Sequence, residues 1–348
     1  MQTYIAAFII ALAAAYFSTP YVKKLALKIG ALDQPDDRKV HAIPIPRMGG
    51  LAIYFGFVLA VLSSIYLSRE IIGILLGGAM ILAVGIIDDL RPLPAKVKLL
   101  GQILSAGVLV FFGVRIEWIA NPFGDMIYLH YLSIPLTILW VVSLINTINL
   151  IDGLDGLAAG VSTIASMTIL LVALEQNFWL VAVLAAALAG SALGFLQHNF
   201  NPAKIFMGDT GSMFLGYMLA AISILGAVKS ATTIALVVPI VALGLPIMDT
   251  AFAIVRRYIS GQPIFKPDKG HLHHRLLEIG LTQKQAVLLM YVISACLGMS
   301  AIALTNVNNI AAILILLCIT AIALFGAKKI GVFKETGEKS ETVKTRLN

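Results

Sequence analysis

The sequence predicts an all-α polytopic membrane protein, and both its composition and its hydropathy lead to this prediction. Of the 348 residues, 59% are hydrophobic and 12% are charged, against about 25% charged in an average soluble domain. The mean hydropathy is +0.93. The apolar runs are long and continuous, which excludes a disordered chain, a cytosolic enzyme and a β-barrel with alternating residues. We expect one transmembrane domain over residues 1–327 and a polar, disordered tail over residues 328–348.

Eleven apolar segments are candidates for membrane-spanning helices. They lie near residues 2–20, 48–67, 71–87, 99–113, 132–150, 157–174, 178–196, 212–228, 232–255, 285–304 and 309–327. The first is expected to be a retained helix, because no basic residue precedes it and lysines follow it. The fourth is short, so it either extends through Lys98 or crosses a thinner part of the bilayer.

The distribution of lysine and arginine sets the expected orientation. Alternate loops assigned to two sides of the membrane hold 22 and 3 of the 25 basic residues. Basic residues concentrate in cytoplasmic loops, so the N-terminus is expected outside and the C-terminus in the cytoplasm. This asymmetry also accounts for the net charge of +7, so no nucleic-acid partner is expected. The cytoplasmic loops are longer and more polar, and a functional site is expected on that side.

Five aspartates are predicted at the cytoplasmic ends of the spans. Asp88 and Asp89 end the third span, Asp152 and Asp155 follow the fifth, and Asp209 precedes the eighth. Helix capping would explain any one of them. Five on one side, interleaved with glycines, would repel one another, and a divalent cation would resolve that repulsion. Aspartate and asparagine oxygens suit Mg2+, whereas the sequence contains no zinc-binding pattern.

The segment 146–156 has a polar residue at every third position, namely Asn146, Asn149, Asp152 and Asp155. On a helix such a pattern drifts slowly around one face. Glycines follow the two aspartates and are expected to break the helix. The polar stripe should therefore continue from the membrane into a loop.

Basic groups surround these acids. Lys98 follows the Asp88–Asp89 pair, Lys204 lies before Asp209, and the last large loop carries the run His271-Leu-His-His-Arg275. Cationic side chains near a metal are what a pyrophosphate needs. For the histidines, phosphate binding or proton transfer is favoured over metal ligation. Asp249, inside the ninth span, is expected to pair with the arginines near its cytoplasmic end.

In combination these motifs resemble the polyprenyl-phosphate N-acetylhexosamine-1-phosphate transferase family. The matching motifs occur in the family's order at residues 39–41 with 46–50, 88–89 with 98–102, 146–156, 199–212 and 271–274. Within the family, the chain looks most like the bacterial undecaprenyl-phosphate GlcNAc-1-phosphate transferases. The run His-Leu-His-His-Arg favours that branch, because the phospho-MurNAc-pentapeptide translocases have three consecutive histidines. Eleven spans and an inner C-terminus also fit it.

The resemblance implies a role for each matching residue. Asp209 and Asn149 would hold Mg2+, for which Mn2+ is the expected substitute, and Asp88 and Asp89 would be the acid pair near the lipid phosphate. The other implied site residues are Asn199 and Phe206 at the uracil, Lys39, His41, Lys98 and Arg275 at the phosphates, Asp152 and Asp155 near the nucleotide, and His271, His273 and His274 around the pyrophosphate.

The expected activity is transfer of GlcNAc-1-phosphate from UDP-GlcNAc to undecaprenyl phosphate, which releases UMP and starts a cell-envelope polysaccharide. The expected location is the bacterial inner membrane, with the active site facing the cytoplasm, and the resemblance allows a homodimer. Two alternatives stay open: phospho-MurNAc-pentapeptide transfer to the same lipid, and a non-catalytic carrier of an anionic lipid or nucleotide sugar. Direct attack and a two-step route through an aspartyl-phosphate are both compatible with the sequence.

Overall fold

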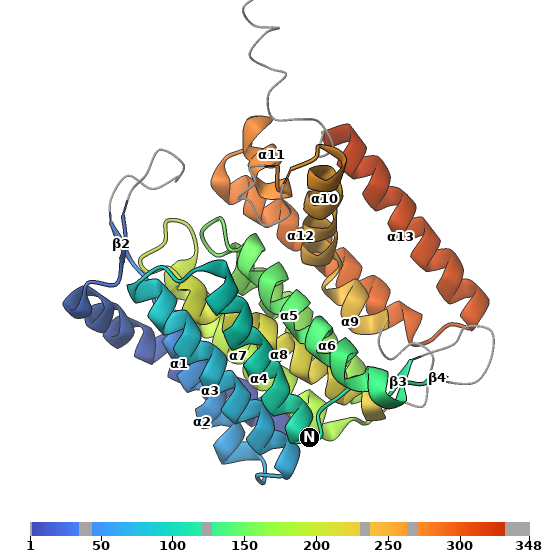
Figure 1. The fold of residues 1–348 in the computed structure, drawn as a ribbon, viewed down its shortest axis with the longest axis horizontal. Helices are drawn as coiled ribbons and strands as arrows, with labels where there is room; N and C mark the ends of the chain where they lie inside the picture. The colour runs from blue at the N-terminus through green and yellow to red at the C-terminus, as the bar shows by residue number, and fades with distance from the viewer. Residues whose placement is uncertain (1, 35–43, 120–126, 230–236, 263–269, 331–348) are drawn as a thin grey trace, which may run out of the picture.

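Helices make up nearly all of the structure, a computed structural model that describes residues 2–34, 44–119, 127–229, 237–262 and 270–330 (Figure 1). A bilayer requires this, because a helix satisfies its backbone hydrogen bonds internally. The helices are α1 (Gln2–Ile29), α2 (Gly50–Ser64), α3 (Arg69–Leu90), α4 (Ala95–Phe111), α5 (Ser133–Ile151), α6 (Leu157–Glu175), α7 (Trp179–Asn199), α8 (Gly208–Lys229), α9 (Val237–Ala242), α10 (Gly244–Ile259), α11 (Leu272–Glu278), α12 (Gln283–Leu304) and α13 (Asn309–Ile330).

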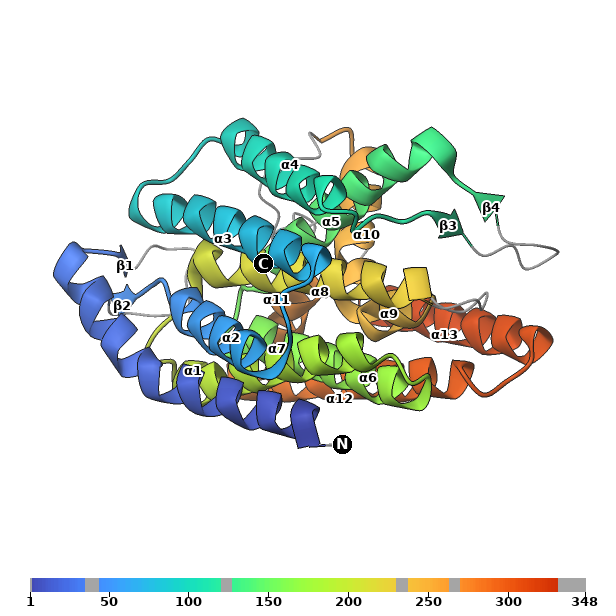
Figure 2. The ribbon, with the colours of Figure 1, turned by 90° about the horizontal axis from the view of Figure 1, so that it is seen from below.

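Two short antiparallel hairpins lie at opposite ends of the bundle (Figures 1 and 2). At one end, β1 (Leu32–Asp33) pairs with β2 (Ile45–Pro46). At the other, β3 (Trp118–Ile119) pairs with β4 (Ile127–Tyr128), followed by the 3-10 helix η1 (His130–Leu132). The rings of Trp118 and Tyr128 lie 4.6 Å apart. Aromatic side chains of this kind favour a membrane interface, which suits the end predicted to face outward.

Eight helices of the described chain are long and apolar enough to cross a membrane, namely α1, α3, α5, α6, α7, α8, α12 and α13. The protein is therefore an all-α, multi-pass membrane protein, as the sequence predicts. Of the other three expected spans, α2 has 15 residues and α4 has 17. At 1.5 Å per residue both are shorter than a bilayer core of about 30 Å. The count of eleven spans and the placement of the termini stay predictions.

The expected span 232–255 departs from the prediction, because its described part is two helices that meet at Leu243. Pro246, in the first turn of α10, has no N–H to donate, and the helix is interrupted just before it. In Figure 1, α9 and α10 accordingly run in different directions. At the C-terminal end, α13 continues to Ile330, three residues past the predicted domain boundary, and the predicted tail beyond it lies outside the described residues.

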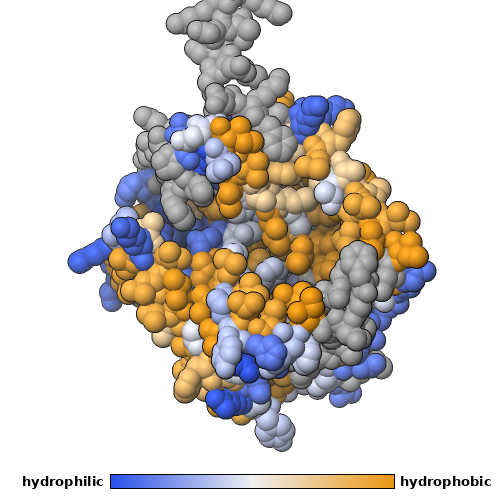
Figure 3. All heavy atoms as spheres, turned by 45° about the vertical axis from the view of Figure 1, so that its right-hand side comes forward, coloured by the Kyte–Doolittle hydropathy of each residue, from blue (hydrophilic) through white to orange (hydrophobic). Residues whose placement is uncertain are grey.

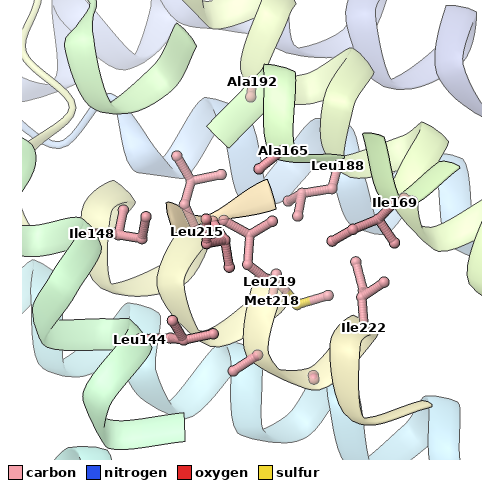
Figure 4. Packing of buried hydrophobic residues seen from close by; sticks show 14 of the residues in the cluster. Leu144, Ile148, Ala165, Ile169, Leu188, Ala192, Leu215, Met218, Leu219 and Ile222 are labelled. Carbon is pink, nitrogen blue, oxygen red and sulfur yellow. The ribbon is translucent and has the colours of Figure 1, made fainter. Parts of the chain in front are cut away.

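The most buried helix is α8, and it forms the centre of the fold. Leu215, Met218, Leu219 and Ile222 on α8 pack against apolar residues of the surrounding helices α5, α6 and α7 (Figure 4). Small residues bring neighbouring helices together, as is common in membrane bundles. A methyl group at Gly194 of α7 would overlap a backbone carbonyl of α1. A fixed central helix gives the residues at its first turn a defined position.

Large apolar side chains cover much of the outer surface. Figure 3 shows hydrophobic residues spread across the face of the molecule and hydrophilic residues gathered at its borders. Many large apolar side chains of the described chain, including Phe17, Leu139, Leu317 and Phe325, are more than half exposed. Lipid chains cover such a surface in a bilayer, whereas in water a patch of this size would drive association.

Candidate active site

The ends of three helices meet in a carboxylate–lysine cluster, formed by Asp88 of α3, Lys98 of α4 and Asp209 of α8. The Lys98 ammonium Nζ lies 2.7 Å from Oδ2 of Asp88 and 2.6 Å from Oδ2 of Asp209. Oδ1 of Asp88 accepts a hydrogen bond of 2.7 Å from the backbone N–H of Leu93. One cation thus holds two carboxylates that are 121 positions apart in the chain. The Lys98 and Asp209 side chains keep about a quarter of their surface exposed, at 26% and 24%.

Asn149 completes the fourth side of this cluster from the last turn of α5. Its side chain forms a hydrogen bond with the Asp209 carboxylate, and its Nδ2 donates to Oγ of Ser212 at 2.8 Å. One turn earlier, Asn146 and Gln102 pair through their amide groups at 2.7 and 3.3 Å. The polar stripe predicted on α5 therefore does face the cluster and continues toward the interior of the bundle.

Asp89 points in a different direction from Asp88, into the first turn of α8. Its Oδ1 accepts from the backbone N–H of Asp209 at 3.0 Å. Its Oδ2 accepts from the backbone N–H of Thr210 at 3.1 Å and from the Thr210 hydroxyl at 2.6 Å. A carboxylate at a helix N-terminus satisfies unpaired amides and interacts favourably with the helix dipole.

Glycines allow this turn of α8 to be packed closely. A methyl group at Gly50 of α2 would overlap the backbone of Thr210 and Gly211, and one at Gly85 of α3 would overlap the backbone of Asp209 and Thr210. Between them, these two helices hold the backbone of residues 209–211 at van der Waals distance. Gly50 and Gly85 therefore allow the backbones of α2 and α3 to approach the start of α8 closely.

The α5–α6 turn, residues 152–156, borders the cluster. Burial raises the pKa of the Asp152 carboxyl, and repulsion from Asp209 and Asp89 raises it further, against the attraction of Arg47. Arg47 itself forms an ion pair with Asp33 in the β1–β2 hairpin. A carboxyl with a raised pKa near several acids holds or releases a proton close to neutral pH.

Asp155 and Asn199 tie this turn to the α7–α8 loop. Asp155 Oδ2 accepts from Asn201 Nδ2 and from the Ala203 backbone, both at 3.0 Å. Asn199 Oδ1 accepts from the Gly156 backbone at 3.1 Å, and its Nδ2 donates to the Ile205 carbonyl at 3.0 Å. The resemblance implied nucleotide contacts for both residues, whereas in the structure they hold two loops in register.

Phe206 lies beside the cluster, at the junction of the α7–α8 loop with the β2 strand. Its backbone N–H donates to the Pro46 carbonyl at 2.8 Å, and its carbonyl accepts from Gly49 at 3.0 Å. The residue is partly exposed. The stacking role that the resemblance implies for its ring stays a prediction.

The residues His271–Arg275, here called the histidine turn, pack on the opposite side of the α5–α6 turn. His271 Nδ1 lies 2.9 Å from Oδ2 of Asp249, and the Leu272 backbone donates to Oδ1 at 2.8 Å. The sequence favoured an arginine partner for Asp249, and the structure gives it this histidine. The reason is the separate α10 helix, which brings Asp249 to the start of α11.

His273 is the most enclosed residue of the histidine turn. Its ring lies against Gly153, where a methyl group would overlap Nε2. Burial, with repulsion from His274, lowers the pKa of His273 to about 3, so its imidazole is neutral at physiological pH. Its Nδ1 is buried without a hydrogen-bond partner among the described atoms. His274 is partly exposed beside it, at a ring distance of 4.3 Å.

The predicted site residues that the structure describes include the carboxylate–lysine cluster and the histidine turn, and the histidine turn meets the α5–α6 turn where Gly153 contacts His273. Arg275 of the histidine turn bonds to Glu278 at 2.9 Å. The predicted phosphate contacts Lys39 and His41 lie outside the described residues.

Comparison with known proteins identifies the family. Residues 71–227 match the profile of glycosyl transferase family 4. A probable undecaprenyl-phosphate N-acetylglucosaminyl 1-phosphate transferase of Bacillus subtilis (strain 168) is 45% identical over 87% of this chain and 85% of its own length. The chain belongs to the polyprenyl-phosphate N-acetylhexosamine-1-phosphate transferase family.

Other members of this transferase family are more distant. A decaprenyl-phosphate N-acetylglucosaminephosphotransferase of Mycolicibacterium smegmatis is 40% identical over 79% of this chain and 76% of its own length. A phospho-N-acetylmuramoyl-pentapeptide-transferase of Thermoanaerobacter sp. (strain X514) is 32% identical over 78% and 88%. The protein is therefore a phosphotransferase of family 4, and the branch suggested by the His-Leu-His-His-Arg run agrees with the higher identity.

Sequence reasoning missed several residues that build the site of this transferase. Thr210, Ser212 and Gln102 bond directly to predicted site residues, and Asp33 holds Arg47 near Asp152. Thr210 and Ser212 carried one usable signal, because they belong to the matching motif at residues 199–212 and hydroxyl side chains often bond to groups near a helix start. Gln102 closes the matching motif at residues 98–102 but had no assigned role, and nothing local marked Asp33.

Proposed function

We propose that this protein transfers GlcNAc-1-phosphate from UDP-GlcNAc to undecaprenyl phosphate, giving undecaprenyl-pyrophosphoryl-GlcNAc and UMP. The observation that carries the proposal is the carboxylate–lysine cluster at the ends of helices α3, α4 and α8. It occurs in a chain that is 45% identical to a probable undecaprenyl-phosphate N-acetylglucosaminyl 1-phosphate transferase of B. subtilis. A partly exposed ammonium flanked by acids suits a reaction between two anionic phosphates, where charge repulsion dominates the barrier.

Each group of the cluster has a role in this scheme. The two carboxylates fix the position of the Lys98 ammonium between them. From that position the ammonium would neutralise phosphate charge and align the two reactants. The Asp88 carboxylate would accept the residual proton of the lipid phosphate, whose second pKa is about 6. The lipid phosphate oxygen would then attack the β-phosphorus, the bond from that phosphorus to the bridging oxygen would break, and UMP would leave.

The donor set suits a magnesium ion. Asp209 and Asn149 lie side by side with hard oxygen atoms, and among the described residues no three His, Cys, Asp or Glu side chains gather as a metal site. Mg2+ commonly takes one or two carboxylates and fills its other positions with waters and substrate phosphates. When bound, it would supply further neutralisation of the pyrophosphate.

The proposed location is the bacterial inner membrane with the cluster facing the cytoplasm, where UDP-GlcNAc is available. The basic residues on the proposed inner side support this orientation. A reporter fused after Asn348 should be cytoplasmic, and one inserted near Asn121 should be external. The same side for both would remove the proposed orientation. A homodimer is a further proposal, tested by the mass of the purified protein in lipid nanodiscs.

The deciding experiment is an assay of the purified protein with undecaprenyl phosphate and each of two nucleotides, UDP-GlcNAc and UDP-MurNAc-pentapeptide. Lipid-linked GlcNAc and UMP, detected by mass spectrometry, are the expected products. Product from the pentapeptide nucleotide alone would favour the second candidate, which the 32% identity to the Thermoanaerobacter transferase keeps open. Binding of both substrates without product, and without exchange of labelled UMP into UDP-GlcNAc, would indicate a carrier.

A further inference from the structure

Two adjacent aspartates on α3 have separate sets of partners. Asp88 contacts Lys98, the Leu93 backbone and the Asp209 side chain, whereas the three hydrogen bonds of Asp89 come from the backbone of Asp209 and Thr210 and from the Thr210 hydroxyl. Successive helical residues point about 100° apart, so neighbours on α3 face different helices. The acid pair of the sequence is therefore two groups with different surroundings.

The partners of Asp89 leave it little capacity for anything else. Asp89 is 6% exposed, and its two oxygens accept from two backbone amides and one hydroxyl, all at 2.6–3.1 Å. An ionised carboxylate offers about four acceptor positions, so most are occupied. The amides it binds are the ones that an anion would otherwise find at this helix N-terminus.

Gly85, four residues before Asp89, lies on the same face of α3. Its lack of a side chain brings the α3 backbone against Asp209 and Thr210. Gly208 is equally constrained, because a methyl group on it would overlap the Asp89 carboxylate, and its φ is +70°. Close packing at the glycines and hydrogen bonds from Asp89 thus fix the backbone of Asp209 and Thr210. Of these two residues, Asp209 is the one whose side chain reaches Lys98.

We propose that Asp89 is a positioning residue: it fixes the first turn of α8 and thereby aims the Asp209 carboxylate at Lys98 and the substrate phosphates. Asp88 alone of the pair then faces the reacting groups. The expected changes in turnover rest on the proposed function. The expected change in the order of the first turn of α8 does not depend on any activity.

The test compares Asp89→Asn, Thr210→Val and Thr210→Ser with the wild type in nanodiscs. An asparagine presents one acceptor and turns an NH2 group toward a donor, and valine lacks the hydroxyl that Asp89 accepts. Hydrogen exchange at the Asp209 and Thr210 amides should therefore quicken about tenfold or more in Asp89→Asn. Thr210→Val should show a smaller change, and Thr210→Ser should restore slow exchange. The matched control is Asp88→Asn, which should leave these amides slow.

Kinetics provide the second readout. Asp89→Asn should lower kcat and raise the Mg2+ concentration for half-maximal turnover, while the acidic limb of the pH–rate profile stays where it is. The double variant Asp89→Asn with Thr210→Val should have a kcat close to that of Asp89→Asn alone, because both substitutions remove the same contact. Loss of the acidic limb in Asp89→Asn, or unchanged amide exchange in that variant, would overturn the proposal. If the wild type forms no lipid product, the proposed function fails, and amide exchange still decides the role of Asp89.

Discussion

The carboxylate–lysine cluster and the histidine turn flank the same α5–α6 turn, yet they are built in contrasting ways. The cluster stands on the helices α3, α4 and α8. Its charged groups are paired, and two of them, Lys98 and Asp209, are partly exposed. The histidine turn stands on α11, a helix of seven residues. Its central His273 is buried, and its Nδ1 has no hydrogen-bond partner within the described part of the chain. The first region keeps charge available to a ligand. The second depends on shape, with a neutral ring filling the space beside Gly153.

The largest expected effect comes from removing the Lys98 cation that Asp88 and Asp209 share. Lys98→Met should leave Asp88 and Asp209 facing each other unneutralised and lower kcat by about 10²–10³, the usual cost of losing one electrostatic stabiliser. Lys96→Met is the matched control, since Lys96 is exposed one half-turn earlier on α4. Comparable losses in both variants, measured as lipid product per minute, would mean that general surface charge matters and that the cluster does not.

The link between the two regions is the contact of Gly153 with His273. Gly153→Ala should push the histidine turn away and lower kcat by about tenfold to a hundredfold, since displacement of about 1 Å has such effects. His273→Ala should also lower turnover with the fold intact. In the double variant the added methyl group has room, so the two losses should not add.

Gly107→Ala is the control for that series, because a methyl group added at Gly107 of α4 would meet no other described side chain or helix within 4 Å. Additive losses in the double variant would show that Gly153 and His273 act separately. Near-normal turnover of His273→Ala would make the histidine turn a structural element only.

The neutral state of His273 gives a prediction on stability. Its pKa is about 3 in the folded protein and about 6.5 in an unfolded chain, so between these values the unfolded state binds more protons. Stability should be full above about pH 6.5 and fall by about 1.4 kcal/mol for each pH unit below it. Thermal unfolding in detergent should show this slope for the wild type and a smaller slope for His273→Gln. Equal slopes would mean that His273 does not set the pH dependence of stability.

The smallest expected effect concerns the turn that both regions share. Asp152 is held near other carboxylates that raise its pKa, so at pH 8 Asp152→Asn should remove repulsion and raise Tm by about 2 °C. Asp155→Asn should instead lower Tm, because Asp155 accepts two hydrogen bonds from the α7–α8 loop. A fall in both variants would show that Asp152 is favourably placed as an anion.

Local sequence patterns are enough to show that the chain is a helical membrane protein. They also show which helix ends carry the polar residues. Hydropathy and helix-breaking glycines are local properties, so they can be read along the chain without knowing its neighbours. The acids at residues 88, 152 and 209 do meet, because the orientation of successive spans places their ends on one side. The resemblance to a known family came from the same local motifs.

Tertiary structure decided which groups pair. That Asp89 binds the start of α8 while Asp88 binds Lys98, that Asp249 meets His271, and that the ninth span divides at Leu243 all depend on contacts between distant helices. Asp89 and Asp209 are 120 positions apart, and no periodicity records which neighbour a side chain will face. Partner choice follows from how closely whole helices approach, and at this site glycines on two of them set that distance.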